Sequence, residues 1–174
     1  IPTTKSQWEF LEMLRSELVE YGFTKVELDP EDSYLVALLP SNLEEANTVP
    51  AIGFIAHVDT ADFNAENINP QIHENYNGED VVLHAEFPNL KNYIGETLIT
   101  TDGTTLLGAD DKAGLVSILE ACLYLMAHPE IPHGDIWLAF GPDEEIGKGA
   151  HRFKAERMPA KFAYTLDSGV VGKL

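Results

Sequence analysis

The stretch AIGFIAHVD, residues 51–59, is a short apolar run that ends in a histidine and an aspartate. A run of this length and composition predicts a buried β-strand. Three further apolar runs, at residues 104–107, 136–140 and 162–166, lead into acidic residues in the same way. Ligands of open α/β sheets bind beyond the carboxyl ends of the strands, so we expect the four clusters to meet at one sheet edge.

Apolar periodicity along the rest of the chain predicts an alternation of strands and helices. The expected elements are helices at 6–21, 111–127 and 145–156, strands at 24–28, 33–39, 51–56, 136–140 and 162–166, a long loop at 60–80, and irregular strands and turns at 81–107. This alternation predicts the α/β class, with a mixed, partly parallel sheet flanked by helices.

Composition narrows the possible partners of the chain. With 29 acidic and 11 basic residues among 174, the net charge is −18, which argues against a nucleic acid or an anionic membrane and suits cations. No apolar stretch approaches the roughly 20 residues of a membrane span. The chain has one cysteine, Cys122, so an intrachain disulfide is excluded and a reducing cytoplasm is expected.

The pair His57 and Asp59 has the chemistry of a metal ligand and its partner. If the strand continues to Asp59, a spacing of two residues places both side chains on one face. Imidazole is a good zinc ligand, and a metal-bound histidine usually donates its other ring N–H to a carboxylate or carbonyl. Taken alone, the pair is more often a histidine at a strand end followed by an aspartate in a turn.

The other clusters offer carboxylates for the same purpose. Asp110 and Asp111 open a predicted helix, where acids complement the helix dipole, but a carboxylate there can also bridge two metal ions. Glu144 and Glu145 are adjacent and point in different directions, so one can bind metal while the other serves as a general base. Each cluster alone, Asp167 included, is also compatible with an ordinary acid at a helix start or turn.

Several carboxylates and one histidine at one edge repel each other unless a cation joins them. This donor set suits zinc, cobalt or manganese. Two metal ions about 3.5–4 Å apart with a bridging carboxylate form the arrangement found in aminopeptidases. The joint pattern therefore predicts a hydrolytic metalloenzyme.

Five stretches also carry a resemblance to a known family. They are GFIAHVDTADF (53–63), NPQIHENYNGED (69–80), LITTDGTTLLGADDKAG (98–114), IPHGDIWLAFGPDEEIGKGAH (131–151) and AYTLDSG (163–169). They resemble the di-zinc metallopeptidase family that includes carboxypeptidases and aminoacylases, and within it the tripeptide aminopeptidases. The resemblance covers nearly the whole chain.

The resemblance implies a role for each clustered residue. His57, Asp110 and Asp167 would be ligands of one zinc ion, and Asp110, as a bridge, and Glu145 would be ligands of a second. The family also implies that Glu144 is the general base that activates the bridging water, and that Asp59 orients His57. A cis peptide bond is implied between Asp110 and Asp111.

The same resemblance implies what lies outside this sequence. Family members are longer, so residues 1–174 are expected to be the N-terminal part of the catalytic domain. The dimerisation domain and the C-terminal part of the catalytic domain, which supplies a last histidine ligand, would then be absent. The full-length form is expected to be a homodimer that removes the N-terminal residue from tripeptides by attack of a metal-bound hydroxide. The fragment alone could be inactive.

Two other interpretations remain open at this point. A carboxypeptidase or N-acyl amino acid deacylase of the same family would share the metal centre, although the segment 69–80 argues against it. A non-catalytic metal-binding domain is the alternative from another class. Glu144 argues against that alternative, since a binding module needs ligands but no base.

Overall fold

The computed structural model describes residues 2–44, 49–78, 87–167 and 169. The chain divides into two compact units, residues 1–61 with 109–174 and residues 62–108. Among the described residues, the first unit holds a five-stranded sheet and two α-helices, and the second holds a two-stranded sheet.

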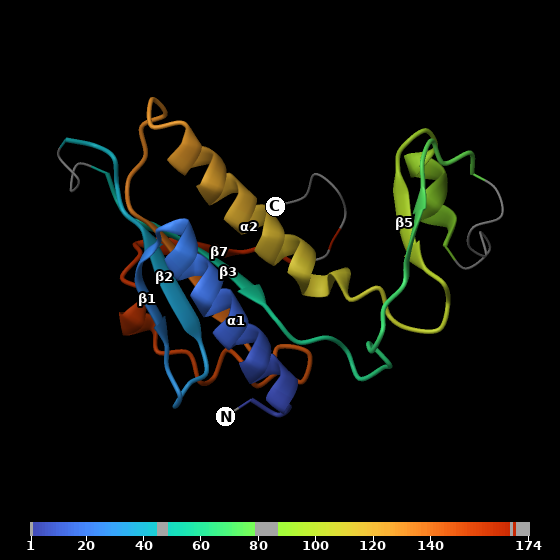
Figure 1. Ribbon diagram of the computed structural model, residues 1–174, viewed down its shortest axis with the longest axis horizontal. Coiled ribbons are helices and arrows are strands. Elements are labelled where there is room, and N and C mark those ends of the chain that lie inside the picture. The colour runs from blue at the N-terminus through green and yellow to red at the C-terminus, as the bar shows by residue number, and fades with distance from the viewer. Residues whose placement is uncertain (1, 45–48, 79–86, 168, 170–174) are drawn as a thin grey trace. The chain divides into compact units, whose positions relative to one another are not determined.

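The sheet of the first unit has the strand order β1-β2-β6-β3-β7 (Figure 1). Its strands are β1 (Thr24–Leu28), β2 (Leu35–Leu39), β3 (Ile52–His57), β6 (Ile136–Gly141) and β7 (Phe162–Thr165). Strand β3 pairs in parallel with β6 and with β7, whereas β2 pairs antiparallel with β1 and with β6. The predicted class is therefore confirmed, and the carboxyl ends of β3, β6 and β7 lie at one edge of the sheet.

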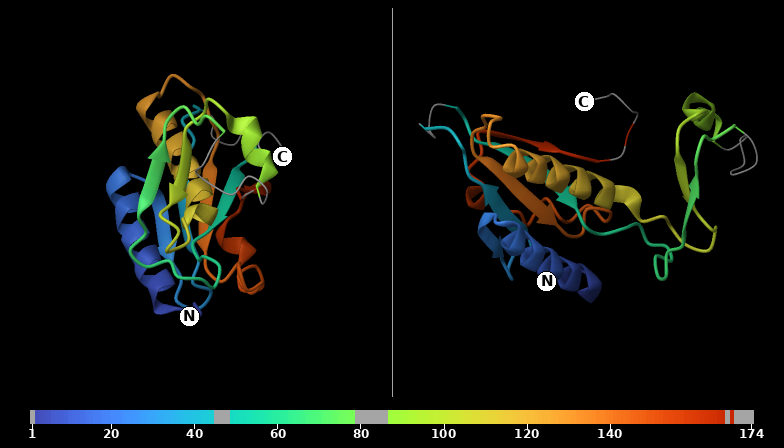
Figure 2. Two further views of the ribbon diagram at one scale, coloured as in Figure 1. Left: turned by 90° about the vertical axis from the view of Figure 1, so that its right-hand side faces the viewer. Right: turned by 45° about the horizontal axis from the view of Figure 1, so that its top comes forward.

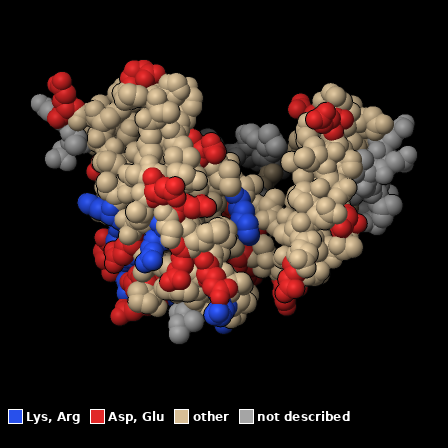
Figure 3. Space-filling model, in the orientation of Figure 1, with Lys and Arg blue, Asp and Glu red and all other residues tan. Residues whose placement is uncertain are grey.

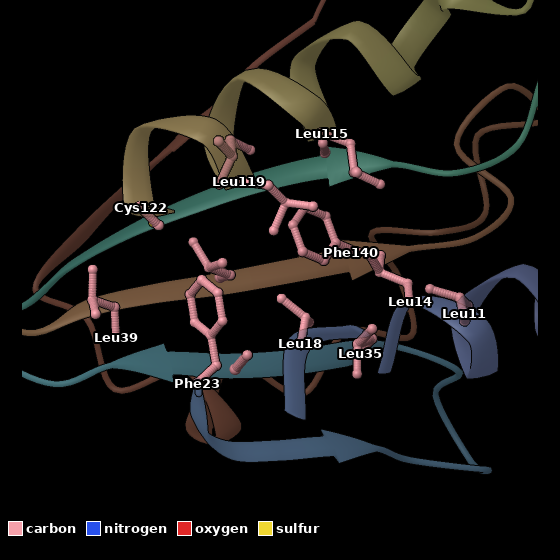
Figure 4. Packing of buried hydrophobic residues seen from close by; sticks show 14 of the residues in the cluster. Leu11, Leu14, Leu18, Phe23, Leu35, Leu39, Leu115, Leu119, Cys122 and Phe140 are labelled. Carbon is pink, nitrogen blue, oxygen red and sulfur yellow. The ribbon is translucent and has the colours of Figure 1, made fainter. Parts of the chain in front are cut away.

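Helices α1 (Lys5–Tyr21) and α2 (Ala109–Ala127) pack on one face of this sheet. Figure 4 shows Leu11, Leu14 and Leu18 of α1 and Leu115, Leu119 and Cys122 of α2 converging on side chains of the strands. Figure 2 gives two further views of the same elements. Both helices follow the apolar spacing of the sequence, because burying one stripe of side chains is what stabilises them. Among the described residues, no helix combines the length and apolarity needed to cross a membrane.

The opposite face of the sheet has its own apolar cluster. It consists of Tyr34, Val36, Leu38, Trp137, Ala139 and Met158, with Phe153 and Ala160 packed against it. The segment that follows β6 supplies Met158, Phe153 and Ala160, so this segment covers the second face. Every residue of β2 and β6 is consequently buried. Burial on both faces explains why these strands read as continuous apolar runs in the sequence.

The helix predicted at 145–156 is wrong. This segment forms turns, and the only helical part is the 3-10 helix η3 (Ala155–Arg157). The backbone N–H groups of Lys148 and Gly149 both donate to the carbonyl oxygen of Asp143, at 3.0 Å each. Asp143 and Gly147 have positive φ angles of 60° and 67°, which a right-handed helix does not accommodate.

Two further expectations, for residues 60–80 and 104–107, differ from the structure of the second unit. The predicted loop at 60–80 contains strand β4 (Pro70–His73), which pairs antiparallel with β5 (Leu98–Thr101). A 3-10 helix, η2 (Pro88–Tyr93), lies between them in the chain. Residues 104–107 form bends and irregular backbone rather than a strand. Residues 79–86, which belong to the predicted loop and irregular region, lie outside the described residues.

Candidate metal centre

Three of the four predicted clusters follow the parallel strands. His57 is the last residue of β3, Glu144 and Glu145 follow β6 after a short connection, and Asp167 comes two residues after β7. The fourth cluster is positioned differently, because Asp110 and Asp111 do not follow a strand. They stand at the start of α2 with non-helical backbone angles, so the regular helix begins after them.

The cluster converges on the imidazole of His57. Its Nε2 atom lies 3.2 Å from Oδ1 of Asp110, 3.8 Å from Oε2 of Glu144 and 4.0 Å from Oδ2 of Asp167. Three sets of possible ligand atoms each lie within 4.8 Å of one another: His57 with Asp110 and Glu145, His57 with Glu144 and Asp167, and Asp110 with Asp111 and Asp167. All four residues expected as ligands are therefore brought together. The grouping differs from the expected one, because Glu144, expected as the base, joins a set.

Asp59 contacts the other side of the imidazole. Strand β3 ends at His57, so the condition under which the two side chains would share a strand face is not met. The chain instead bends, and Nδ1 of His57 lies 3.1 Å from the backbone oxygen of Asp59 and 3.4 Å from its Oδ1. Asp59 is buried and also accepts the backbone N–H groups of Glu144 and Glu145, at 3.1 and 3.0 Å. One carboxylate thus contacts both the imidazole and the loop that carries the two glutamates.

The electrostatics of the cluster favour a positive charge at its centre. Burial lowers the pKa of His57, but the hydrogen bond and charge of Asp59, with further carboxylates, outweigh it and raise the pKa to about 9. Burial raises the pKa of Asp59, yet hydrogen bonds from His57 and from the backbone of Glu144 and Glu145 hold it below its usual value. This negative field, together with an imidazole and several carboxylates as donors, fits a divalent cation. Acidic side chains are also prominent on the face of the molecule shown in Figure 3.

Asp111 is a buried member of the cluster to which the sequence assigned no separate role. The Asp110–Asp111 peptide bond is cis, which confirms the bond implied by the resemblance. Asp110 is half exposed, whereas Asp111 is 3% exposed and its Oδ2 accepts the backbone N–H of His57 at 3.3 Å. Burial raises the pKa of Asp111 to about 6. Asp111 thereby joins the start of α2 to the end of β3.

Gly114 makes room for this arrangement. A methyl group at position 114 would overlap Oδ1 of Asp111 and come within 2.9 Å of the backbone oxygen of Leu166. The absence of a side chain at Gly114 therefore leaves room for the carboxylate of Asp111 and the backbone of Leu166. Lys112 lies on the same helix turn and donates from Nζ to the backbone oxygen of Val58 at 3.2 Å, which adds a cation beside the carboxylates.

Gly114→Ala is expected to lower the free energy of unfolding by up to about 2 kcal/mol. Helix propensity alone would raise it by about 1 kcal/mol, but overpacking against a buried carboxylate costs about 1–3 kcal/mol. Urea unfolding of the metal-free protein measures the difference. Gly169→Ala is the control, because a methyl group there meets no described atom within 4 Å. A stabilised Gly114→Ala variant would contradict the assigned role of Gly114.

A cavity of about 300 Å³ adjoins the cluster. Its polar wall includes His57, Glu144 and Asp167, and its apolar wall includes Tyr34 and Phe153, whose rings lie 4.6 Å apart. Burial, followed by the nearby carboxylates, raises the pKa of Tyr34 to about 12, so its hydroxyl is neutral at physiological pH. Neither aromatic residue was singled out from the sequence, because apolar spacing does not distinguish a cavity wall from a core.

Comparison with known proteins agrees with the motifs. Residues 100–171 match the sequence model described as peptidase family M20/M25/M40. Peptidase T of Fusobacterium nucleatum is 56% identical over 183 aligned residues, which cover 100% of this chain and 44% of that protein. The chain therefore spans less than half the length of the curated relatives it matches.

Two crystal structures are similar to the described fold. That of aminopeptidase PepT from Bacillus cereus has a TM-score of 0.72 and 32% identity, covering 95% of this chain and 39% of the other. That of a tripeptidase from Staphylococcus aureus has a TM-score of 0.70 and 29% identity, covering 92% of this chain and 38% of the other. The resemblance to tripeptide aminopeptidases that the sequence motifs carry is thereby confirmed.

Proposed function

Because this chain is a relative of the peptidase T proteins along its whole length, we propose that it forms part of a metallo-aminopeptidase that removes the N-terminal residue from tripeptides. The observation that carries the proposal is the convergence of one imidazole and four carboxylates from four separate segments of the chain. Asp110, Glu144 and Asp167 lie within 4.0 Å of Nε2 of His57, and Glu145 shares a ligand set with His57 and Asp110.

The proposed ligand roles are those that the family resemblance implies, and the convergence of these side chains supports them. His57, Asp110 and Asp167 would hold one zinc ion, and Asp110, as a bridge, would hold a second together with Glu145. The combination of nitrogen and carboxylate oxygen donors suits zinc, and also cobalt or manganese. A bound divalent ion would polarise the scissile carbonyl group and make a water molecule more acidic.

Glu144 would transfer protons during the reaction, and Asp59 would orient the imidazole of His57. Glu144 would accept a proton from the attacking water and pass it to the departing amine, which is the usual work of a general base. Its side chain is 57% exposed, so a substrate can reach it. Asp59 would hold His57 by its Nδ1 side, leaving Nε2 directed toward the carboxylates.

The wider organisation of the protein is part of the same proposal. The chain covers 44% of its Fusobacterium relative, and we take it, as the motif resemblance implies, as the N-terminal part of a catalytic domain. The remaining sequence would supply a further histidine ligand and a dimerisation domain, and the full-length form would be a homodimer. A cytoplasmic location is proposed from the single cysteine, and a small peptide is the proposed substrate.

A substrate panel on the full-length protein tests the proposal. A tripeptide with a free N-terminus is expected to yield one amino acid and a dipeptide, whereas the same tripeptide with an acetylated N-terminus is expected to remain intact. A chelator should abolish turnover, and added zinc should restore it. Release of the C-terminal residue, or hydrolysis of N-acetyl amino acids instead of the tripeptide, would point to the carboxypeptidase or deacylase alternative.

A further inference from the structure

Gln7 of helix α1 makes two hydrogen bonds to a residue 136 positions later in the chain. Its Nε2 donates to Oδ1 of Asp143 at 3.1 Å, and its Oε1 accepts the backbone N–H of Asp143 at 3.0 Å. Both residues are buried, with Gln7 8% and Asp143 1% exposed. A buried amide with both ends engaged by one partner defines the position of that partner closely.

Asp143 in turn begins the loop that carries the two glutamates. Its carboxylate also accepts the backbone N–H of Thr3 at 3.0 Å and a guanidinium N–H of Arg152 at 2.9 Å. Its carbonyl oxygen accepts two N–H groups from Lys148 and Gly149, which close the loop over residues 143–149. Asp143 is therefore the fixed point of this loop, held from α1 on one side and from within the loop on the other.

Three consecutive backbone N–H groups are bonded to side chains from distant elements. The N–H of Asp143 donates to Gln7, and those of Glu144 and Glu145 donate to the two oxygens of Asp59. The side chains of Glu144 and Glu145 are themselves exposed. Packing does not hold them, so their location depends on the backbone that these bonds fix.

We propose that Gln7 is a positioning residue, which acts through Asp143 to place Glu144 and Glu145 against His57. This inference rests on the proposed function, because it assigns a purpose to the place of the two glutamates. Gln7 itself touches neither substrate nor metal in the proposed site. It contributes a rigid attachment of the loop to helix α1.

Gln7→Met in the full-length protein tests the inference. Methionine has a similar length and volume but cannot make either bond. Loss of an outer partner typically costs about 10–100-fold in metal affinity or activity, and we expect a fall of that size in kcat with KM for the tripeptide nearly unchanged. Zinc affinity, measured by calorimetry, should fall as well because Glu145 is on the same loop. The visible absorption spectrum of the cobalt-loaded protein should change.

Leu18→Val is the matched control. Leu18 lies on the same helix and is fully buried in the core, so the change lowers stability without removing any bond to the loop. Kcat, zinc affinity and the cobalt spectrum of this variant should match those of the unmodified protein. If Gln7→Met does not fold, Gln7→Asn keeps the amide but withdraws it by one methylene group, and the same losses are expected.

The outcomes separate this inference from the function on which it rests. If the unmodified protein binds no metal and cleaves no tripeptide, the proposed function fails. If the unmodified protein is active and folded Gln7→Met or Gln7→Asn retains its kcat, zinc affinity and cobalt spectrum, the positioning role is wrong. Equal losses in Leu18→Val would also overturn it, because they would follow from stability alone.

Discussion

Glu144→Gln is expected to lower kcat for tripeptide hydrolysis by roughly 10²–10⁴-fold, the usual contribution of a general base. Glutamine has the same shape but cannot accept the proton of the attacking water. The backbone bond from residue 144 to Asp59 does not depend on the side chain, so the loop should keep its place. The four proposed ligands all remain, and zinc affinity should therefore stay close to that of the unmodified protein.

The measurement combines steady-state kinetics with zinc calorimetry on the full-length protein. Glu120→Gln makes the same chemical change at an exposed position of α2 and should leave both quantities unaltered. A Glu144→Gln variant that turned over tripeptide at the normal rate would exclude Glu144 as the base. A variant that lost its zinc as well would instead identify Glu144 as a ligand, which its place beside His57 and Asp167 would allow.

His57→Ala is expected to remove tight metal binding. The imidazole is the only nitrogen donor in the described ligand sets, and two of the three sets include it. Its loss should weaken zinc affinity by more than about 100-fold, beyond the effect of losing an outer partner. Asp110 and Asp167 would remain, but they would face each other with neither a cation nor an imidazole between them.

Calorimetric zinc titration of the metal-stripped protein measures this change. His128→Ala is the control, because the His128 side chain is only partly exposed and contacts Glu130 rather than the cluster. One tight site per chain, lost in His57→Ala, would support a preformed first site in this chain. Two tight sites would mean that residues within the chain complete the second site. Unchanged affinity in His57→Ala would disprove its role as a ligand.

Much of the site could be predicted because its residues follow local patterns. The apolar run at 51–56 became β3, and His57 stands at its end because buried parallel strands expose their carboxyl ends at one edge. The ends of β6 and β7 place Glu144, Glu145 and Asp167 by the same rule. The motif context then suggested which of these side chains would serve as ligands and which as a base.

Local patterns failed where chain geometry depends on distant partners. Residues 145–156 have a sequence compatible with a helix, but bonds to the Asp143 carbonyl and positive φ angles turn the chain instead. Residues 104–107 form no strand, and Asp110 lies instead at the start of α2. The strand also stops at His57, and Asp59 meets the imidazole through a bend in the chain.

The sequence by itself determined the α/β class, the strands that end at the site and the residue types gathered there. The apolar periodicity that predicts strands and helices is a local property of the sequence. It can be identified without knowing which elements pack together. Only the tertiary structure decided that Asp59 binds the N–H groups of Glu144 and Glu145, and that Gln7 holds Asp143. Such bonds join residues far apart in the chain, so their formation depends on how α1, β3 and β6 pack together.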